Sequence, residues 1–243
     1  MRISKRVWDN YVDNLSMIDK KAADHMKAVI KRYGMDNNTV LINFAYAIVT
    51  KYGEAAAALT ATMYDAIVEA EELYLPPAQI AETATIGETA KTINGTLKSG
   101  NEGLISTAVG VLVKRASADT MLKNALRDGA EFAWIPHGDT CAFCLTLASN
   151  GWRKISEKAI KNGHAEHIHA NCDCTYAIRF NEKSGVEGYD PEVYKKIYYS
   201  ADGSNGKDKI NSIRRNLYEQ NKDKILEQKR AAYAARKERE NEG

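Results

Sequence analysis

The sequence predicts a mainly α-helical protein with an elongated helical N-terminal region, a small α+β module and a helical C-terminal extension. Two observations lead to this prediction. Apolar residues recur at three- and four-residue spacing through about the first 130 positions, which is the period of a helix face. From Trp134 onward, turn-forming residues surround cysteines and histidines, and the following "CTYAIRF" alternates as a strand does. We place the boundaries at 1–133, 134–182 and 183–243.

The helices expected in the first region are bounded by residues that stop or start a helix. Gly34 ends the first helix, and Gly53 marks the end of the second. Pro76 and Pro77 cannot continue a helix, but they can begin one. The expected helical ranges are 15–33, 38–52, 54–72, 78–99, 103–116 and 118–132.

The last region is expected to be loop-rich first and helical afterwards. Its apolar side chains between Tyr189 and Tyr199 could anchor a partner or pack back on the protein, since aromatic residues serve both roles. From Lys207 to the end, the chain carries 11 Lys or Arg against 7 Asp or Glu and forms helix readily. This segment is therefore a basic helical tail with little to bury.

The overall charge excludes several broad classes of protein. The chain has 34 basic and 32 acidic residues, so its net charge of +2 gives no general attraction to nucleic acid or membrane. The longest apolar run, "VLINFAYAIV", is far below the roughly 18 to 20 residues that span a bilayer. Residues 1–20 are too charged for a signal peptide. We therefore expect a cytoplasmic start, where thiols stay reduced and grouped cysteines indicate metal binding before disulfides.

The four cysteines fall in two short segments, "GDTCAFC" and "HAEHIHANCDC". A structural zinc site needs four thiolate or imidazole ligands in a tetrahedron, and a Cys-x-x-Cys turn supplies two of them. Three residues of the second segment compete for the remaining two positions. We favour the set that includes Cys174 and treat Cys172 as its rival. The five candidate ligands are Cys141, Cys144, His169, Cys172 and Cys174.

The other histidines are weaker candidates. His164 and His167 lie earlier in the second segment, and His25 and His137 have no partner pattern. A catalytic zinc site would need an open position and a general base such as Glu166 or Asp173. With four soft ligands already at hand, a closed structural Zn²⁺ site is favoured, and it would staple a loop-rich segment too small for its own core.

Two simpler interpretations of the cysteines remain open. A redox Cys-x-x-Cys pair usually belongs to a thioredoxin-like domain, but the strand-helix alternation of that domain is missing here. Buried thiols without a metal are the second interpretation, because free cysteine is among the most buried residue types. Metal binding is favoured over both by the two-segment spacing.

The stretch "GDTCAFCLTLASNGW", followed by "HIHANCDCTYAIRF", resembles the signature of the MuF-like family of phage head morphogenesis proteins, which are minor capsid proteins. The helical "KYGEAAAALTATMYDAIVEA" and the later "GYDPEVYKKIYY" also look similar to that family, so the resemblance covers most of residues 40–200. The matching motif positions are Gly138, Asp139, Cys141, Cys144, Leu147, Ala148, Gly151, His169, Cys172 and Cys174.

The resemblance implies a minor structural protein of a tailed bacteriophage or prophage, associated with the portal on the inside of the head. Its implied partners are the portal protein and the major capsid or scaffold protein, with no membrane partner. It would be present in the host cytoplasm during assembly and in the capsid interior afterwards. The basic tail could contact packaged DNA through phosphates, weakly and with strong salt dependence. No catalytic activity is carried over, so we expect a protein that is not an enzyme.

Two alternatives of other classes stay open at this point. A metal-dependent nuclease of the His-Asn-His type is suggested by "HAEHIHANC", but it requires a hairpin-plus-helix site, and no short helix with a final histidine follows. A zinc-ribbon regulator that binds nucleic acid would need basic or aromatic residues clustered around the ligands, and these are missing. The sequence favours the virion protein.

Overall fold

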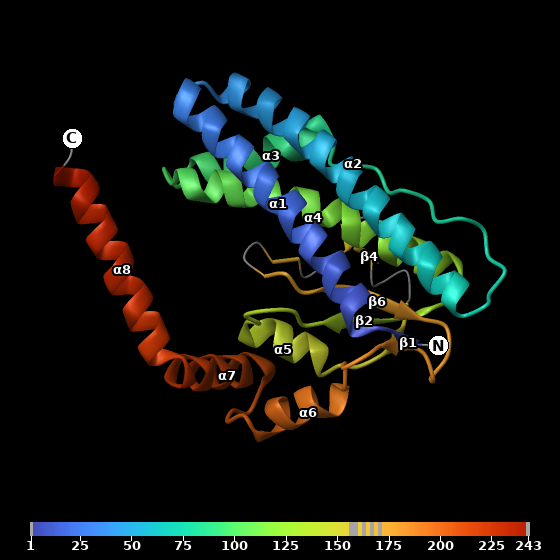
Figure 1. The fold of residues 1–243 in the computed structure, drawn as a ribbon. Helices are drawn as coiled ribbons and strands as arrows, with labels where there is room; N and C mark the ends of the chain where they lie inside the picture. The colour runs from blue at the N-terminus through green and yellow to red at the C-terminus, as the bar shows by residue number, and fades with distance from the viewer. Residues whose placement is uncertain (1, 156–159, 162–163, 166–167, 170–171, 242–243) are drawn as a thin grey trace.

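The computed structural model describes residues 2–155, 160–161, 164–165, 168–169 and 172–241 (Figure 1). It confirms the predicted class, because most of the chain is helical and the strands form a small module. The helices are α1 (Lys5–Tyr33), α2 (Asn38–Ala70), α3 (Ile86–Leu97), α4 (Glu102–Arg127), α5 (Ala142–Ala148), α6 (Pro191–Ser200), α7 (Gly206–Gln220) and α8 (Lys222–Asn241). The strands are β1 (Arg2–Ile3), β2 (Glu131–Ile135), β3 (Arg153–Lys154), β4 (Ile160–Lys161), β5 (His164–Ala165), β6 (Thr175–Arg179) and β7 (Gly185–Val186).

The helices α1 to α4 form one body in which α4 packs against the other three (Figure 1). Apolar residues at helix-face spacing fill the space between them, as the periodicity predicts. Met26, Leu41, Ile93 and Ile105 are among the fully buried members of one cluster. The body therefore has a hydrophobic core of its own at the end formed by α3.

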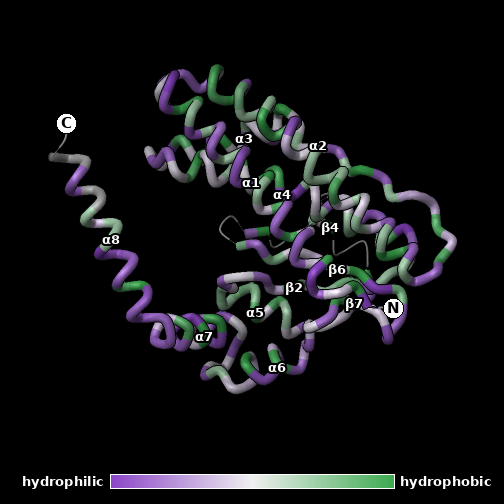
Figure 2. The backbone as a smooth tube through the Cα atoms, viewed as in Figure 1, coloured by the Kyte–Doolittle hydropathy of each residue, from purple (hydrophilic) through white to green (hydrophobic). Residues whose placement is uncertain are grey.

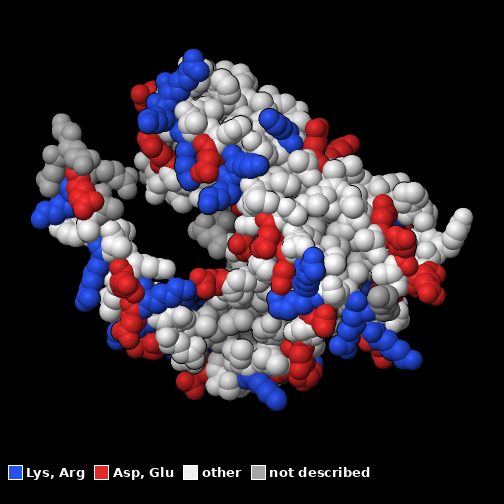
Figure 3. All heavy atoms as spheres, viewed as in Figure 1, with Lys and Arg blue, Asp and Glu red and all other residues white. Residues whose placement is uncertain are grey.

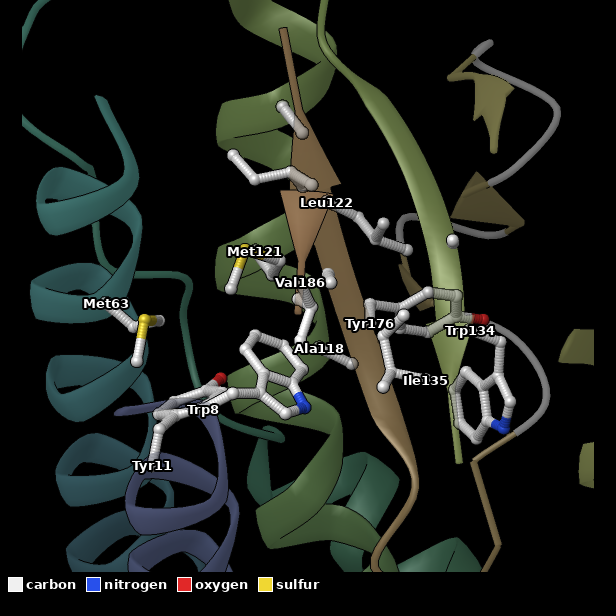
Figure 4. Close-up of a cluster of buried hydrophobic side chains, with 14 of the residues drawn as sticks. Trp8, Tyr11, Met63, Ala118, Met121, Leu122, Trp134, Ile135, Tyr176 and Val186 are labelled. Carbon is white, nitrogen blue, oxygen red and sulfur yellow. The ribbon is translucent and has the colours of Figure 1, made fainter. Parts of the chain in front are cut away.

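The small sheet lies against the opposite end of this body. β2 is its central strand, with β3 and β6 antiparallel on either side. Figure 4 shows side chains of β2 and β6 facing those of the helices, and the same cluster contains Trp8 of α1, Met121 of α4, and Trp134 and Tyr176 of the sheet. The module and the helical body thus bury their apolar surfaces against each other.

The C-terminal helices leave the body in steps. α6 and α7 pack on α5, while α8 extends away from the rest of the chain and is mostly hydrophilic (Figures 1 and 2). The tyrosines before α7 differ in how they pack. Tyr189 donates a hydrogen bond to the carbonyl of Ala148 and stacks on Tyr194, whereas Tyr199 is 73% exposed.

The predicted break at Gly53 is wrong, because α2 continues through it. A Cβ at Gly53 would lie 2.8 Å from Cγ2 of Thr83 and 3.5 Å from Cβ of Ala116. The glycine therefore permits a close approach between α2 and its neighbours, and the helix supports its backbone on both sides. The separation of 103–116 from 118–132 is wrong in the same way, since Ser117 lies inside α4 and its hydroxyl contacts that of Thr60 at 2.8 Å.

The helix expected at 78–99 begins later, at Ile86. The residues before it are extended, because α4 side chains occupy their backbone groups: Asn124 accepts from the amide of Gln79 and donates to its carbonyl, both at 2.8 Å. Thr85 and Glu88 then form a capping box that starts α3. The backbone before Ile86 thus bonds to a polar side chain of α4 in place of the expected helical hydrogen bonds.

Two further boundaries differ from expectation. Phe132 belongs to β2, because α4 ends at Arg127 and Gly129 turns the chain with a φ of 71°. Residues 191–200 form α6, started by Asp190 as N-cap and a proline at the first position. Among the described residues, no helix combines the length and the apolar character that crossing a bilayer requires.

Candidate metal centre

The two cysteine segments lie at the same end of the β2–β6 strand pair. β2 ends at Ile135, shortly before Cys141, and β6 begins at Thr175, directly after Cys174. Ile135 and Thr175 are paired in the antiparallel register. Pairing of the two strands therefore brings together segments that are separated by about 30 residues of sequence.

The first turn is shaped by a glycine and a short helix. Gly138 has a φ of 60°, which favours glycine, and Cys141 is the N-cap residue of α5. Cys144 is the third residue of the helix and is buried, while Cys141 is exposed. Both sulfurs therefore project from the start of α5.

The second segment adds donors at distances that suit a tetrahedral ion. The Nδ1 atom of His169 lies 3.5 Å from Sγ of Cys141 and 3.5 Å from Sγ of Cys144. Sγ of Cys144 lies 3.3 Å from Sγ of Cys172. In a zinc site with ordinary bond lengths, neighbouring nitrogen and sulfur ligands are about 3.5–3.8 Å apart. The two distances from His169 match this spacing, and the sulfur pair is somewhat closer, so the donors gather where a Zn²⁺ ion could bind after small side-chain shifts.

The five predicted donors form two triads that share one sulfur. The first triad is Cys141, Cys144 and His169, and the second is Cys144, Cys172 and Cys174. Within each triad the donor atoms all lie within 4.8 Å of one another. Five donors exceed what one tetrahedral ion binds, so the choice of four stays a prediction.

The ionisation of the buried sulfurs is strongly coupled. Hydrogen bonding with Cys172 and Cys174 raises the pKa of the Cys144 thiol. Hydrogen bonding from Cys144 and Cys172 lowers the pKa of Cys174 to about 4. Without a cation, one thiolate forms and its neighbours stay protonated, because adjacent buried negative charges repel. A divalent ion would remove this constraint, so the cluster suits a metal better than three independent thiols.

One side of the cluster opens to a groove of about 960 Å³ between α5 and the α7–α8 pair. Cys141, Phe143 and His169 line one wall, and Leu217 and Lys224 line the other. Figure 3 shows the hollow between α8 and the remainder of the molecule. A small chelator can therefore reach the exposed edge of the cluster from solvent.

The weaker histidine candidates have other partners. His25 contacts the hydroxyl of Tyr52 at 3.1 Å, and the ring of His137 lies between carboxylates of α1. Nδ1 of His164 is 2.7 Å from a carboxylate oxygen of Asp119 and Nε2 is 2.9 Å from one of Glu88. His167 and Glu166 lie outside the described residues.

Two residues that sequence reasoning missed attach this segment to the helical body. Asp119 of α4 is 1% exposed, binds His164 and accepts from the amide of Ala165. Lys114 of α4 donates to the carbonyl of Cys172 at 2.9 Å. The available signal was only that charged residues stand in a helix with many buried apolar residues, since buried charges need partners.

One known protein family matches most of the chain. Residues 2–201 match the family model described as VG15 protein. The chain belongs to the VG15 family. VG15 is a viral, phage-associated gene family. The match includes α1 to α6 and both cysteine segments, whereas α7 and α8 follow it. No curated protein and no solved structure matches the chain.

Proposed function

We propose that this VG15 family member is a minor structural protein of a tailed bacteriophage or prophage that acts in head morphogenesis. Membership in a phage-associated family supports the source. The MuF-like cysteine and histidine motif, whose donors meet in space, supports the specific role and is the observation that carries the proposal. The site of action is the capsid interior, at the portal.

The Cys/His cluster holds one structural Zn²⁺ in this proposal. The ion supplies positive charge that lets several cysteines ionise together, and it joins the turn before α5 to the segment before β6. The sequence favours Cys174 over Cys172 as the ligand beside Cys141, Cys144 and His169. In this proposal the order is reversed, because Sγ of Cys172 lies 3.3 Å from Sγ of Cys144, and Cys174 becomes the competing sulfur. Because the ion binds the donors only when folding has brought them together, the free energy of metal binding adds to the free energy of folding.

The protein is proposed to work without catalysis. A His-Asn-His nuclease needs a histidine free to activate water and a metal with open positions. His164 is held between Asp119 and Glu88, and His169 faces two cysteines. These contacts favour a structural use of both histidines.

The portal protein is the proposed partner, and the basic C-terminal helix is a proposed secondary contact with packaged DNA. α8 stands away from the body, and its described Lys and Arg side chains are exposed (Figure 3). Binding through phosphates alone is weak and falls steeply with salt. α8 would then hold the protein near DNA without reading its sequence.

Co-purification from infected or induced cells tests the proposal. Tagged protein should bring down the portal protein, and purified phage particles should contain the chain in few copies. The test variant is Cys141→Ser with Cys144→Ser, which should lose both the bound metal and the association with particles. Absence of the wild-type chain from purified particles contradicts the assigned role.

A plasmid cleavage assay separates this proposal from the nuclease alternative. The purified protein is incubated with plasmid and magnesium, manganese or zinc, and the plasmid should stay intact. Cleavage that disappears in His167→Ala or His169→Ala would replace the structural assignment with a nuclease.

A further inference from the structure

Lys114 connects the helical body to the segment that carries the second group of metal donors. Its side chain is 16% exposed, and its Nζ donates to the carbonyl oxygen of Cys172 at 2.9 Å. The same nitrogen lies 3.3 Å from a carboxylate oxygen of Asp19 in α1 and 3.9 Å from one of Asp173. One ammonium group therefore touches α1 and both residues at the start of the "CDC" stretch.

The fold makes room for this arrangement. Asp19 is also 16% exposed, and it reaches Lys114 across the face of Gly110 on α4. A Cβ at Gly110 would lie 2.4 Å from Oδ1 of Asp19, closer than atoms can approach. Any larger residue at this position would displace the carboxylate that faces Lys114. The glycine, the carboxylate and the lysine thus form one unit at the contact of α1 and α4.

The proposed metal centre carries a net negative charge that a nearby cation would stabilise. Three cysteine thiolates and a neutral histidine around Zn²⁺ carry a net charge of about −1, and four thiolates carry about −2. Lys114 and Cys172 also line a small cavity of about 30 Å³ between body and module, room for about one or two waters. The centre is open to solvent on the side of the groove, but on the side of Lys114 little water screens its charge. The ammonium, which Asp19 and Asp173 offset only in part, therefore stabilises the thiolates from this side.

We propose that Lys114 is a positioning residue for the metal centre: it fixes the backbone at Cys172 and balances the charge of the metal-bound thiolates. Asp19 holds the lysine in place. This inference rests on the proposed structural metal and goes beyond it by naming the residues of the helical body that set metal affinity.

Zinc affinity of the full-length protein, measured by competition with a coloured chelator, tests the proposal. Lys114→Met keeps the length of the side chain and removes its charge and its hydrogen bond. Residues that orient metal ligands typically contribute about 10- to 100-fold in affinity, and we expect a loss of this size. Lys114→Arg restores the cation and should recover most of the affinity. Lys123→Met, an exposed position on the same helix, is the matched control and should bind as the wild type does.

Thermal unfolding with and without chelator separates positioning from simple support of the fold. If Lys114 positions the centre, Lys114→Met narrows the gap between the unfolding midpoints of the zinc-bound and chelator-treated proteins. A lysine that only braces α1 against α4 would lower both midpoints equally and leave the gap unchanged, which overturns the proposal.

A second variant keeps the test decisive if Lys114→Met does not fold. Lys114→Gln retains a donor for the Cys172 carbonyl and loses only the charge, so it should show a smaller loss of zinc affinity. Wild-type zinc affinity in Lys114→Gln, with the wild type binding zinc, would overturn the charge-balancing role of Lys114 even if Lys114→Met does not fold. A folded wild-type protein that binds no zinc would overturn the proposed metal centre as well.

Discussion

At the scale of single residues, Cys144 has the largest predicted role because it is the sulfur shared by both donor triads. Cys141 belongs to one triad and is exposed, whereas Cys144 is fully buried at the start of α5. Both candidate sets of four, Cys141, Cys144 and His169 with either Cys172 or Cys174, therefore use Cys144.

Cys144→Ser should abolish stoichiometric zinc binding, whether Cys172 or Cys174 is the fourth ligand beside Cys141, Cys144 and His169. Cys174→Ser should retain the ion if Cys172 is the ligand, because three cysteines and His169 then remain. Elemental analysis of protein prepared without chelator measures both. Full zinc occupancy in Cys144→Ser would contradict the shared role of this sulfur.

A second residue-scale network supports the helical body. Asp128, whose side chain is 4% exposed, accepts from Arg127 and from the hydroxyl of Tyr64 at 2.6 Å. Burial alone would raise the pKa of the Asp128 carboxyl, but the hydrogen bonds from Arg127 and Tyr64 outweigh it and the pKa is lowered. Ionised Asp128 is therefore the form that stabilises the fold.

Asp128→Asn should lower the free energy of unfolding by about 2 kcal/mol near neutral pH, because two partners lose a charged acceptor. A carboxyl whose pKa is lowered by folding contributes stability above its unfolded pKa of about 3.9 and loses it as pH falls through the folded value. The difference from wild type should therefore shrink below about pH 4. Urea unfolding between pH 3 and pH 7 measures it, with Asp36→Asn, an exposed position, as the control.

The candidate donors could be predicted from sequence, whereas their supports could not. Cys141, Cys144 and the later cysteines are recognised by their spacing within two short segments. This spacing can be read from the sequence without the fold. Lys114 and Asp119 acquire their roles only when α4 lies against the second segment, about 50 residues away in sequence. The contacts of Lys114 and Asp119 depend on tertiary packing, and no local sequence pattern predicts them.

At the scale of elements, helix periodicity located the helices and misplaced their ends. Gly53 predicts the end of a helix by its residue type, but a glycine inside a helix also serves where another segment approaches closely. The start of α3 shows the converse, because the sequence carries two competing start signals: Pro76 and Pro77, and the capping box of Thr85 and Glu88 that begins the helix. Contacts from α4 decide between these signals.

Gly53→Val should destabilise the protein by about 1–3 kcal/mol, since its side chain would overlap Thr83 and crowd Ala116. Gly95→Val, inside α3, is the matched control because no atom lies within 4 Å of the position of its Cβ. It should change stability by less than about 0.5 kcal/mol, as helix propensity alone requires. Equal effects of the two substitutions in chemical denaturation would contradict the close contact at Gly53.

At the scale of the whole molecule, the metal module and the helical body share a core, whereas the end of the chain stands apart. Trp8 and Met121 of the body pack in the same cluster as Trp134 and Tyr176 of the sheet. α8 has no buried residue among those described. The proposed division into three regions stays a prediction. Loss of the metal should lower the stability of the shared core, whereas loss of α8 should not.

Removal of α8 after Asn221 should leave zinc content unchanged and move the thermal midpoint by less than about 2 °C, because almost no apolar surface is buried by this helix. Retention on DNA at low salt should weaken, since 7 of the 34 basic residues lie in α8. Calorimetry and a salt titration of DNA retention measure the two effects. A large drop in the midpoint would contradict the view that α8 is an appendage.

The central claim is that donors from two distant segments close around one ion, and zinc-edge X-ray absorption of the purified protein tests it most directly. We expect about one zinc per chain and a shell of four donors, with sulfur at about 2.3 Å and nitrogen at about 2.0–2.1 Å. A folded protein without bound metal, or a shell containing only oxygen and nitrogen, would contradict the claim.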